Sequence, residues 1–153
     1  MFVRDFIYVA QPFEVAAPRF VSDTSWLAPL AEEAAASARA MAAQLREASD
    51  DTPVPVPPGR IRCEVGPLRA RVGSLLVPLR LFGEHGADGF PRLAGDLEVA
   101  PVSAERSLVA LGATYPRPTH HGAALQRIER ATEAGVRVFL DGIATVLGRP
   151  LDA

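Results

Sequence analysis

Residues 89–118 read GFPRLAGDLEVAPVSAERSLVALGATYPRP, and this stretch decides the fold. In LAGDLEVA the apolar and polar residues alternate, so that Leu97 would face a core while Asp96 and Glu98 face solvent, as in a half-buried strand. The linker PVSAE joins this segment to RSLVALGATY, a second apolar segment of strand length. The stretch therefore predicts a β-hairpin.

A long amphipathic helix is predicted to follow the hairpin. After Pro116 and Pro118 the apolar period changes from 2 to 3.6. One apolar stripe runs from about residue 122 to residue 147, and the helix should end at Gly148, with Pro150 just beyond. The stripe comprises Ile128, Thr132, Gly135, Phe139, Gly142 and Val146, widened by Leu125 and Ile143.

The N-terminal part is predicted to be a strand followed by helices. FVRDFIYVA has the composition of a strand and is ended by Gln11 and Pro12. A short helical turn should follow, with Pro18 near its start, because a proline deeper in a helix removes a backbone donor and clashes with the preceding turn. Residues 25–49 are rich in strong helix formers and predict a longer helix, with Pro29 in its first turn. The next segment, DDTPVPVPPG, predicts an extended connector within the domain.

Two further strands complete the predicted sheet. GRIRCEV alternates cleanly, with Ile61, Cys63 and Val65 on one face. SLLVPLRLFGE predicts a longer apolar strand, in which Pro78 indicates either an edge position or a bulge, and EHGADG predicts a turn.

This order of elements, a strand, helices, an antiparallel meander and a long final helix, is typical of the helix-grip fold. FPRLAGDLEVAPVSAERSLVALGATYPRP followed by GAALQRIERATEAGVRVFLDGIA resembles bacterial members of the START-like, or SRPBCC, superfamily. The resemblance implies a single α+β domain over residues 1–153, with a curved antiparallel sheet wrapped around the C-terminal helix. It also implies an apolar cavity between helix and sheet, which in that superfamily holds lipids, polyketides, hormones or aromatic substrates.

The composition fits one domain and excludes several mechanisms. The 153 residues carry a net charge of −2, which provides no basic face for nucleic acid. All 16 basic residues are arginine, which excludes Schiff-base and phosphate-loop lysines and indicates a GC-rich bacterial genome. Cys63 is the only cysteine, so no intrachain disulfide can form, and no secretory signal or membrane-length apolar segment is recognisable. We therefore expect a cytoplasmic protein without a cofactor.

The expected ligand site lies on the face of the final helix that meets the sheet. Gly135 and Gly142 share this face, where they either leave room for a ligand or permit close packing of helix on sheet. The candidate ligand-binding residues are Trp26, Arg80, Tyr115, His120, Ile128, Thr132, Gly135 and Phe139.

Each polar candidate also has a structural interpretation. Tyr115 either stands at the entrance of the site or covers the core as an amphipathic lid, and Trp26 is either a ligand contact or a packing anchor. Arg80 could bind a carboxylate or a carbonyl if it pointed inward, but strand alternation favours an outward position. His120 could act as an acid, a base or a hydrogen-bond donor at the mouth. Adjacent His121 would point elsewhere, so no metal site is predicted.

The expected function is binding of a small hydrophobic molecule between the C-terminal helix and the sheet, by apolar burial with one or two selective polar groups. Two alternatives remain open. A polyketide cyclase- or aromatase-like enzyme would use the cavity to order its substrate while a histidine or tyrosine moves a proton. A non-enzymatic domain would bind a protein partner, and a filled core with an exposed apolar patch would favour it.

Overall fold

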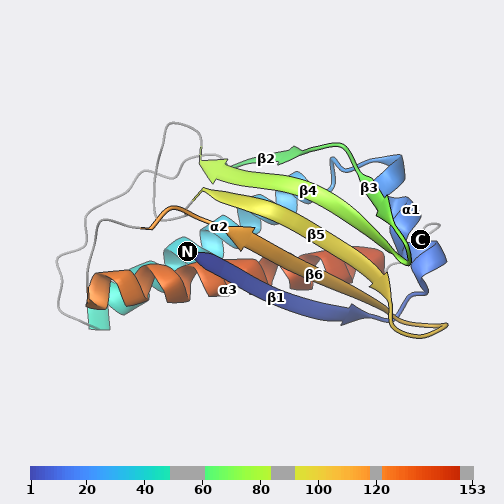
Figure 1. The fold of residues 1–153 in the computed structure, drawn as a ribbon. Coiled ribbons are helices and arrows are strands. Elements are labelled where there is room, and N and C mark those ends of the chain that lie inside the picture. Colours follow the sequence, from blue (N-terminus) through green and yellow to red (C-terminus); the bar gives the residue numbers. More distant parts are fainter. Residues whose placement is uncertain (49–60, 84–91, 118–121, 149–153) are drawn as a thin grey trace.

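The structure is a computed structural model, and it describes residues 1–48, 61–83, 92–117 and 122–148. The predicted connector, the turn EHGADG and the two adjacent histidines lie outside the described residues. Figure 1 shows the elements, which in chain order are β1 (Phe2–Val9), α1 (Phe13–Ser22), α2 (Leu27–Ala48), β2 (Ile61–Val65), β3 (Arg69–Arg71), β4 (Ser74–Gly83), β5 (Leu93–Pro101), β6 (Ser107–Thr114) and α3 (Ala123–Leu147).

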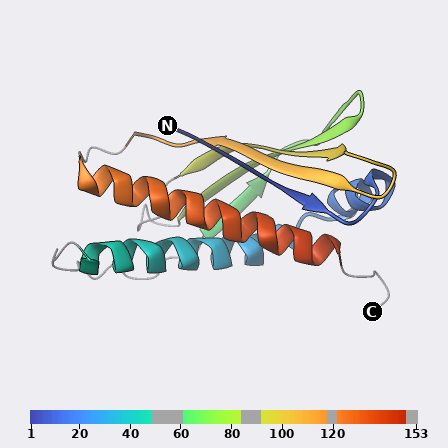
Figure 2. The ribbon, with the colours of Figure 1, turned by 90° about the horizontal axis from the view of Figure 1, so that it is seen from below.

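The strands form one curved antiparallel sheet with the order β1-β6-β5-β4-β2, in which β3 also pairs with β4. The predicted hairpin is confirmed as β5 and β6, with Leu97 opposite Leu111. Strand β1 closes one edge by pairing with β6. The long helices α2 and α3 lie against one face of this sheet, and the other face carries no helix among the described elements (Figure 2). The predicted α+β helix-grip architecture is therefore confirmed.

Pro78 lies in an inner strand, so of the two alternatives for it, an edge position or a bulge, the edge position is wrong. Strand β2 pairs with β4 up to the pair Val65↔Leu79, and β3 resumes the pairing at Arg69↔Leu76. Pro78 therefore sits where the neighbouring ladder is interrupted, and its carbonyl accepts a hydrogen bond from the Gly66 N–H at 2.9 Å. Proline has no N–H, and at position 78 that N–H would point toward this interruption, where no partner strand accepts it. Pro78 therefore removes no hydrogen bond between strands. The short strand β3 was not predicted.

Helices α2 and α3 run antiparallel and side by side beneath the sheet (Figure 2). Small side chains at helical spacing allow α2 to approach closely; its buried alanines are Ala31, Ala34, Ala35, Ala38 and Ala42. On α3, a Cβ at Gly142 would lie 2.9 Å from Leu30 Cδ2 of α2. Gly142 therefore faces α2, and the expectation that it packs against the sheet is wrong.

Pro18 lies in the interior of helix α1. The prediction had placed it near the start of the helix. Because proline has no N–H, the carbonyl of Glu14, four residues earlier, loses its helical hydrogen bond. Glu14 is exposed, so water can donate to this carbonyl instead. The helix is held by packing, because Ala16 and Phe20 are buried against the core. Tertiary contacts therefore outweigh the local cost of the proline.

The boundaries of α3 agree with the prediction, with Gly122 at its N-cap and Gly148 at its C-cap. Gly122 has a φ of 63°, a left-handed conformation that glycine adopts without strain. Within the described ranges, no helix is both long enough and apolar enough to cross a membrane.

Candidate functional site

The space between α3 and the sheet is filled over most of the helix. Thr132, Gly135 and Phe139, three of the predicted site residues, are buried. Phe139 is 0% exposed and belongs to the same core cluster as Leu97 of β5. Beyond residue 131 the predicted cavity is thus occupied by side chains of the protein itself.

The beginning of α3 is less well covered. Residues 123–130 include no buried position, and apolar Leu125 and Ile128 are half-buried and lie outside the core cluster. Met41, near the end of α2, and Met1, at the start of β1, are also half-buried. The start of α3 and the end of α2 meet at the same end of the molecule (Figure 1). We call this group, Met1, Met41, Tyr115, Leu125 and Ile128, the apolar end.

Tyr115 is the polar residue of the apolar end. It follows β6 on the core-facing side, is 6% exposed, and exchanges two main-chain hydrogen bonds with Met1, of 2.7 and 2.9 Å. Burial raises the pKa of its phenol, and the negative charges of Glu129 and Glu133 on α3 raise that pKa further. The phenol therefore lies near the first turns of α3 and stays protonated at neutral pH.

Thr132 borders the apolar end on α3. Its hydroxyl donates a 2.8 Å hydrogen bond to the carbonyl of Ile128, one turn earlier in the same helix. The bond satisfies the buried hydroxyl donor, so Thr132 can face an apolar region at little cost. This hydrogen bond places Thr132 beside Ile128, and Tyr115 lies near the same turns of α3 through Glu129 and Glu133.

Two other predicted residues lie away from this region. Arg80 is exposed on the sheet face opposite the helices, between buried Leu79 and Leu81, so the inward alternative for it is wrong. Trp26 lies at the corner between α1 and α2, where its ring packs against Phe20 at 5.0 Å between centroids. Its indole N–H donates to the Asp23 carbonyl at 2.8 Å, which supports the interpretation as a packing anchor.

His120 lies outside the described residues, so its role at the mouth stays a prediction. Within the described part of the chain, no group of three or more histidine, cysteine, aspartate or glutamate residues is placed to hold a metal ion.

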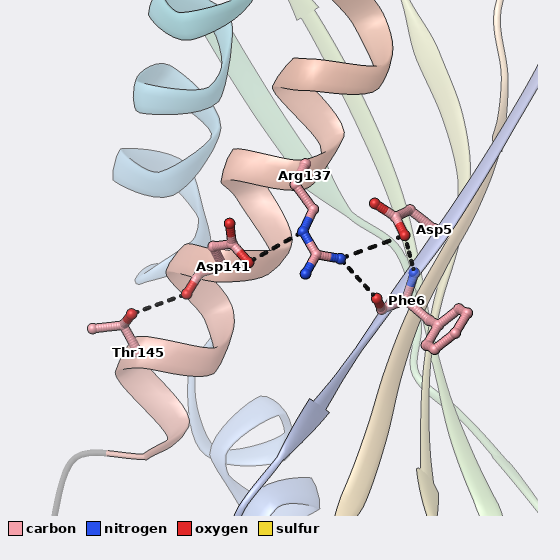
Figure 3. Close-up of polar contacts among 5 residues, drawn as sticks. All are labelled: Asp5, Phe6, Arg137, Asp141 and Thr145. Atoms are coloured by element: carbon pink, nitrogen blue, oxygen red, sulfur yellow. Dashed lines mark hydrogen bonds and ion pairs between the residues drawn. The ribbon is translucent and has the colours of Figure 1, made fainter.

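A polar cluster occupies the free edge of β1 (Figure 3). Met1 and Tyr115 exchange two main-chain hydrogen bonds, and in an antiparallel pair such bonds recur at every second residue. The odd-numbered residues of β1 therefore bond to β6, and the even-numbered residues direct their N–H and C=O groups away from the sheet edge. At the middle of the edge, the Phe6 N–H donates to the Asp5 carboxylate at 2.8 Å, and the Arg137 guanidinium donates to the Phe6 carbonyl at 3.1 Å.

The same arginine also joins two carboxylates. Its nitrogens lie 3.6 Å from Asp5 and 3.4 Å from Asp141, one turn along α3. Side chains thus satisfy both outward main-chain groups of Phe6, which blocks another strand from pairing there. We call Asp5 and Arg137 the edge clamp. Arg137 and Asp141 lie outside the apolar stripe of α3, and no signal in the sequence linked either residue to Asp5.

No protein-family model matches the chain. A search of curated proteins finds no match either. Among solved structures, the chain is similar to a hypothetical protein from Helicobacter pylori, with 13% identity, a TM-score of 0.49, and coverage of 95% of this chain and 87% of that one. It is also similar to the Zhui aromatase/cyclase from Streptomyces sp. R1128, with 13% identity, a TM-score of 0.45, and coverage of 97% and 94%. At these values neither similarity assigns a function to the chain.

Proposed function

We propose that the chain binds a small hydrophobic molecule at the apolar end. The observation that carries this proposal is the change along α3, where the packed core stops near Ala131 and half-buried Leu125 and Ile128 continue the apolar stripe. Apolar surface withdrawn from water contributes about 25 cal/mol per Å². A ligand that covers these two side chains would extend the core to the start of the helix.

The chemistry around Tyr115 indicates the class of ligand. A phenol that stays neutral can donate one hydrogen bond and accept another. The neighbouring carboxylates of Glu129 and Glu133, which raise its pKa, would repel an anionic head group. The preferred ligand is therefore an uncharged or cationic hydrophobic molecule with one hydrogen-bonding group.

These properties suit binding better than proton transfer. A general acid or base works best with a pKa near the working pH. Burial raises the pKa of Tyr115 above the ordinary value for tyrosine, and so farther from that range. The cyclase-like alternative would then need His120 as its proton-transfer group, which stays a prediction.

A neutral fluorescent probe tests ligand binding without charge repulsion. We expect N-phenyl-1-naphthylamine to bind the folded protein with enhanced fluorescence. Ile128→Ser should weaken binding about fivefold, since loss of roughly 40 Å² of apolar contact costs about 1 kcal/mol. Val146→Ser is the matched control, because Val146 is also half-buried on α3 but lines a surface hollow beside Leu30 at the other end of the helix.

Two results would contradict the proposal: no probe binding by the folded wild-type protein, or equal losses of affinity in the Ile128 and Val146 variants. Native mass spectrometry of freshly purified protein, searching for a co-purifying small molecule, would identify the natural ligand.

A second candidate function is binding of a protein partner. It is favoured by the filled interior beyond residue 131 together with exposed aromatic residues on β1, namely Phe2, Phe6 and Tyr8. Large apolar side chains gathered on an exposed surface are typical of interaction sites. This function would use the sheet face opposite the helices, and it is compatible with a ligand at the apolar end.

A further inference from the structure

The face of the sheet opposite the helices carries a row of aromatic side chains along its edge strand. Phe2, Phe6 and Tyr8 are 64%, 49% and 56% exposed. The rings of Phe6 and Tyr8 are in edge contact, with centroids 5.6 Å apart. No helix covers these strands on that side in the described part of the chain (Figure 2). We call this surface of β1, β6 and β5 the outer face.

Small residues lie next to the aromatic row. The outward positions of β6 opposite Arg4 and Phe6 are Gly112 and Ala110. A Cβ at Gly112 would lie 3.5 Å from the Phe2 ring, so that ring leans over β6. The centre of the outer face is therefore low, and its β1 edge is raised.

On the outer face, a positive residue on β1 and a negative residue on β5 lie in the same row, with β6 between them. Arg4 pairs in register with Gly112, and Gly112 pairs with Asp96, so the three residues form one row across three strands. At the usual strand spacing the Cα atoms of Arg4 and Asp96 are roughly 10 Å apart. In the described part of the chain no ion pair joins these two side chains. Phe2 and Ala94 form the next row through Thr114.

We propose that the outer face binds a second copy of this chain, which deepens the partner-binding function proposed here. The two-fold axis would run parallel to β6, midway between the two sheets. It places β1 of one copy over β5 of the other, and each row of residues lies opposite the same row of the second copy. Arg4 then lies opposite the second copy's Asp96, and Phe2 lies opposite its Ala94. Every contact occurs twice, as in an isologous interface. Two sheets that pack face to face in this way lie about 10 Å apart.

The edge clamp blocks pairing of β1 with the β1 of a second copy at the middle of the strand. Pairing of β1 with a second β1 would need the outward main-chain groups of Phe6, which are bonded to Asp5 and Arg137. Face-to-face packing leaves these bonds intact. Because the face is only three strands wide, we expect a weak dimer, with a dissociation constant in the micromolar range.

Charge exchange tests the interface in the full-length protein by sedimentation equilibrium at about 10 to 500 µM. Wild-type protein should form a dimer. Arg4→Glu and Asp96→Arg should each weaken it at least about tenfold, because each places like charges opposite one another. The double variant Arg4→Glu/Asp96→Arg should restore dimerisation to near the wild-type level. Arg106→Glu, in the exposed loop after β5, makes the same charge change elsewhere and should leave the dimer unchanged.

A monomeric wild-type protein at the highest concentration would overturn the proposal, as would single variants that dimerise like wild type or a double variant that stays monomeric. Arg4 is exposed and Asp96 is half-exposed, so folding should persist, which circular dichroism verifies. If Asp96→Arg fails to fold, Tyr8→Ser replaces it, and dimerisation of that variant at wild-type strength would equally overturn the proposal. Probe titration of the same variants reports on the apolar end separately, so that failure of the dimer and failure of ligand binding are distinguishable.

Discussion

Replacement of Gly142 by alanine measures how firmly α2 packs against α3. The new Cβ would lie 2.9 Å from Leu30 Cδ2, 3.5 Å from its Cγ and 3.6 Å from its Cδ1. The closest atom is the end of a flexible side chain. Leu30 is half-buried beside a surface hollow, so its methyl group can turn away from the helix interface.

Two opposing effects set the sign of the change in stability. Alanine stabilises a helix interior by about 1 kcal/mol relative to glycine. Displacing Leu30 from its rotamer costs of order 0.5 kcal/mol. We therefore expect Gly142→Ala to stabilise the protein by about 0.5 kcal/mol, which raises Tm by roughly 1 to 2 °C for a chain of this length.

Urea and thermal denaturation of four proteins, wild type, Gly142→Ala, Leu30→Ala and the double variant, measure this balance. The benefit of Gly142→Ala should grow toward 1 kcal/mol in the Leu30→Ala background, because the displaced side chain is then absent. Destabilisation by more than about 1 kcal/mol in both backgrounds would refute the reasoning, because overpacking of that size would show that atoms other than Leu30 resist the new methyl group.

Four further predictions follow from single features of the structure. Gly95→Ala should destabilise the protein by at least about 3 kcal/mol in urea denaturation or prevent folding, because its Cβ would lie 2.6 Å from the main-chain Cα of Ala113, which cannot rotate away. Burial raises the pKa of Cys63 from 9.0 to about 11, so the thiol favours folding below pH 9 and this contribution is lost as the pH rises toward 11. Stability should therefore fall by at most about 2 kcal/mol between pH 8 and 10.5, less after screening of this half-buried group, and Cys63→Ala should remove this part of the pH dependence. Truncation after Pro118 removes α3 and should abolish the cooperative thermal transition, whereas a retained transition would show that the sheet folds without its helix. Gly135→Ala should lower stability without changing probe affinity if Gly135 serves only close packing, whereas higher stability with weaker probe binding would place a ligand beside it.

The sequence predicted most of the architecture because the periodicity of apolar residues reflects burial. Strand β5 alternates cleanly and α3 keeps one apolar stripe, so both were placed to within a few residues. Strand β3 was missed because its three residues, Arg69–Arg71, are all exposed and carry no apolar alternation. The position of α2 beside α3 was missed as well. An alanine-rich sequence indicates that a helix can pack closely, but it does not indicate which element the helix packs against.

The candidate site was predictable only where it follows from the order of elements. A hairpin that leads into α3 necessarily brings Tyr115 near the first turns of that helix, and Ile128 lies there. The direction of Arg80 depended on which face of β4 packs against the helices. The packing of Trp26 against Phe20 depended on the angle between α1 and α2. Contacts between distant segments left no signal, and the edge clamp joins Asp5 to a residue in the last helix.

The alanine-rich face of α2 also explains why a ligand site in this chain would be confined to one end. Alanine buries little surface, so the buried Ala31, Ala35 and Ala38 let α2 lie close to α3 and occupy space beneath the sheet. A fold with α3 alone under its sheet would leave that space to a ligand, but here α2 packs against both α3 and β2. The interior therefore closes along the part of α2 that carries these buried alanines. Beside residues 123–130, where α3 has no buried position, the apolar surface of Leu125 and Ile128 remains for a small molecule to cover.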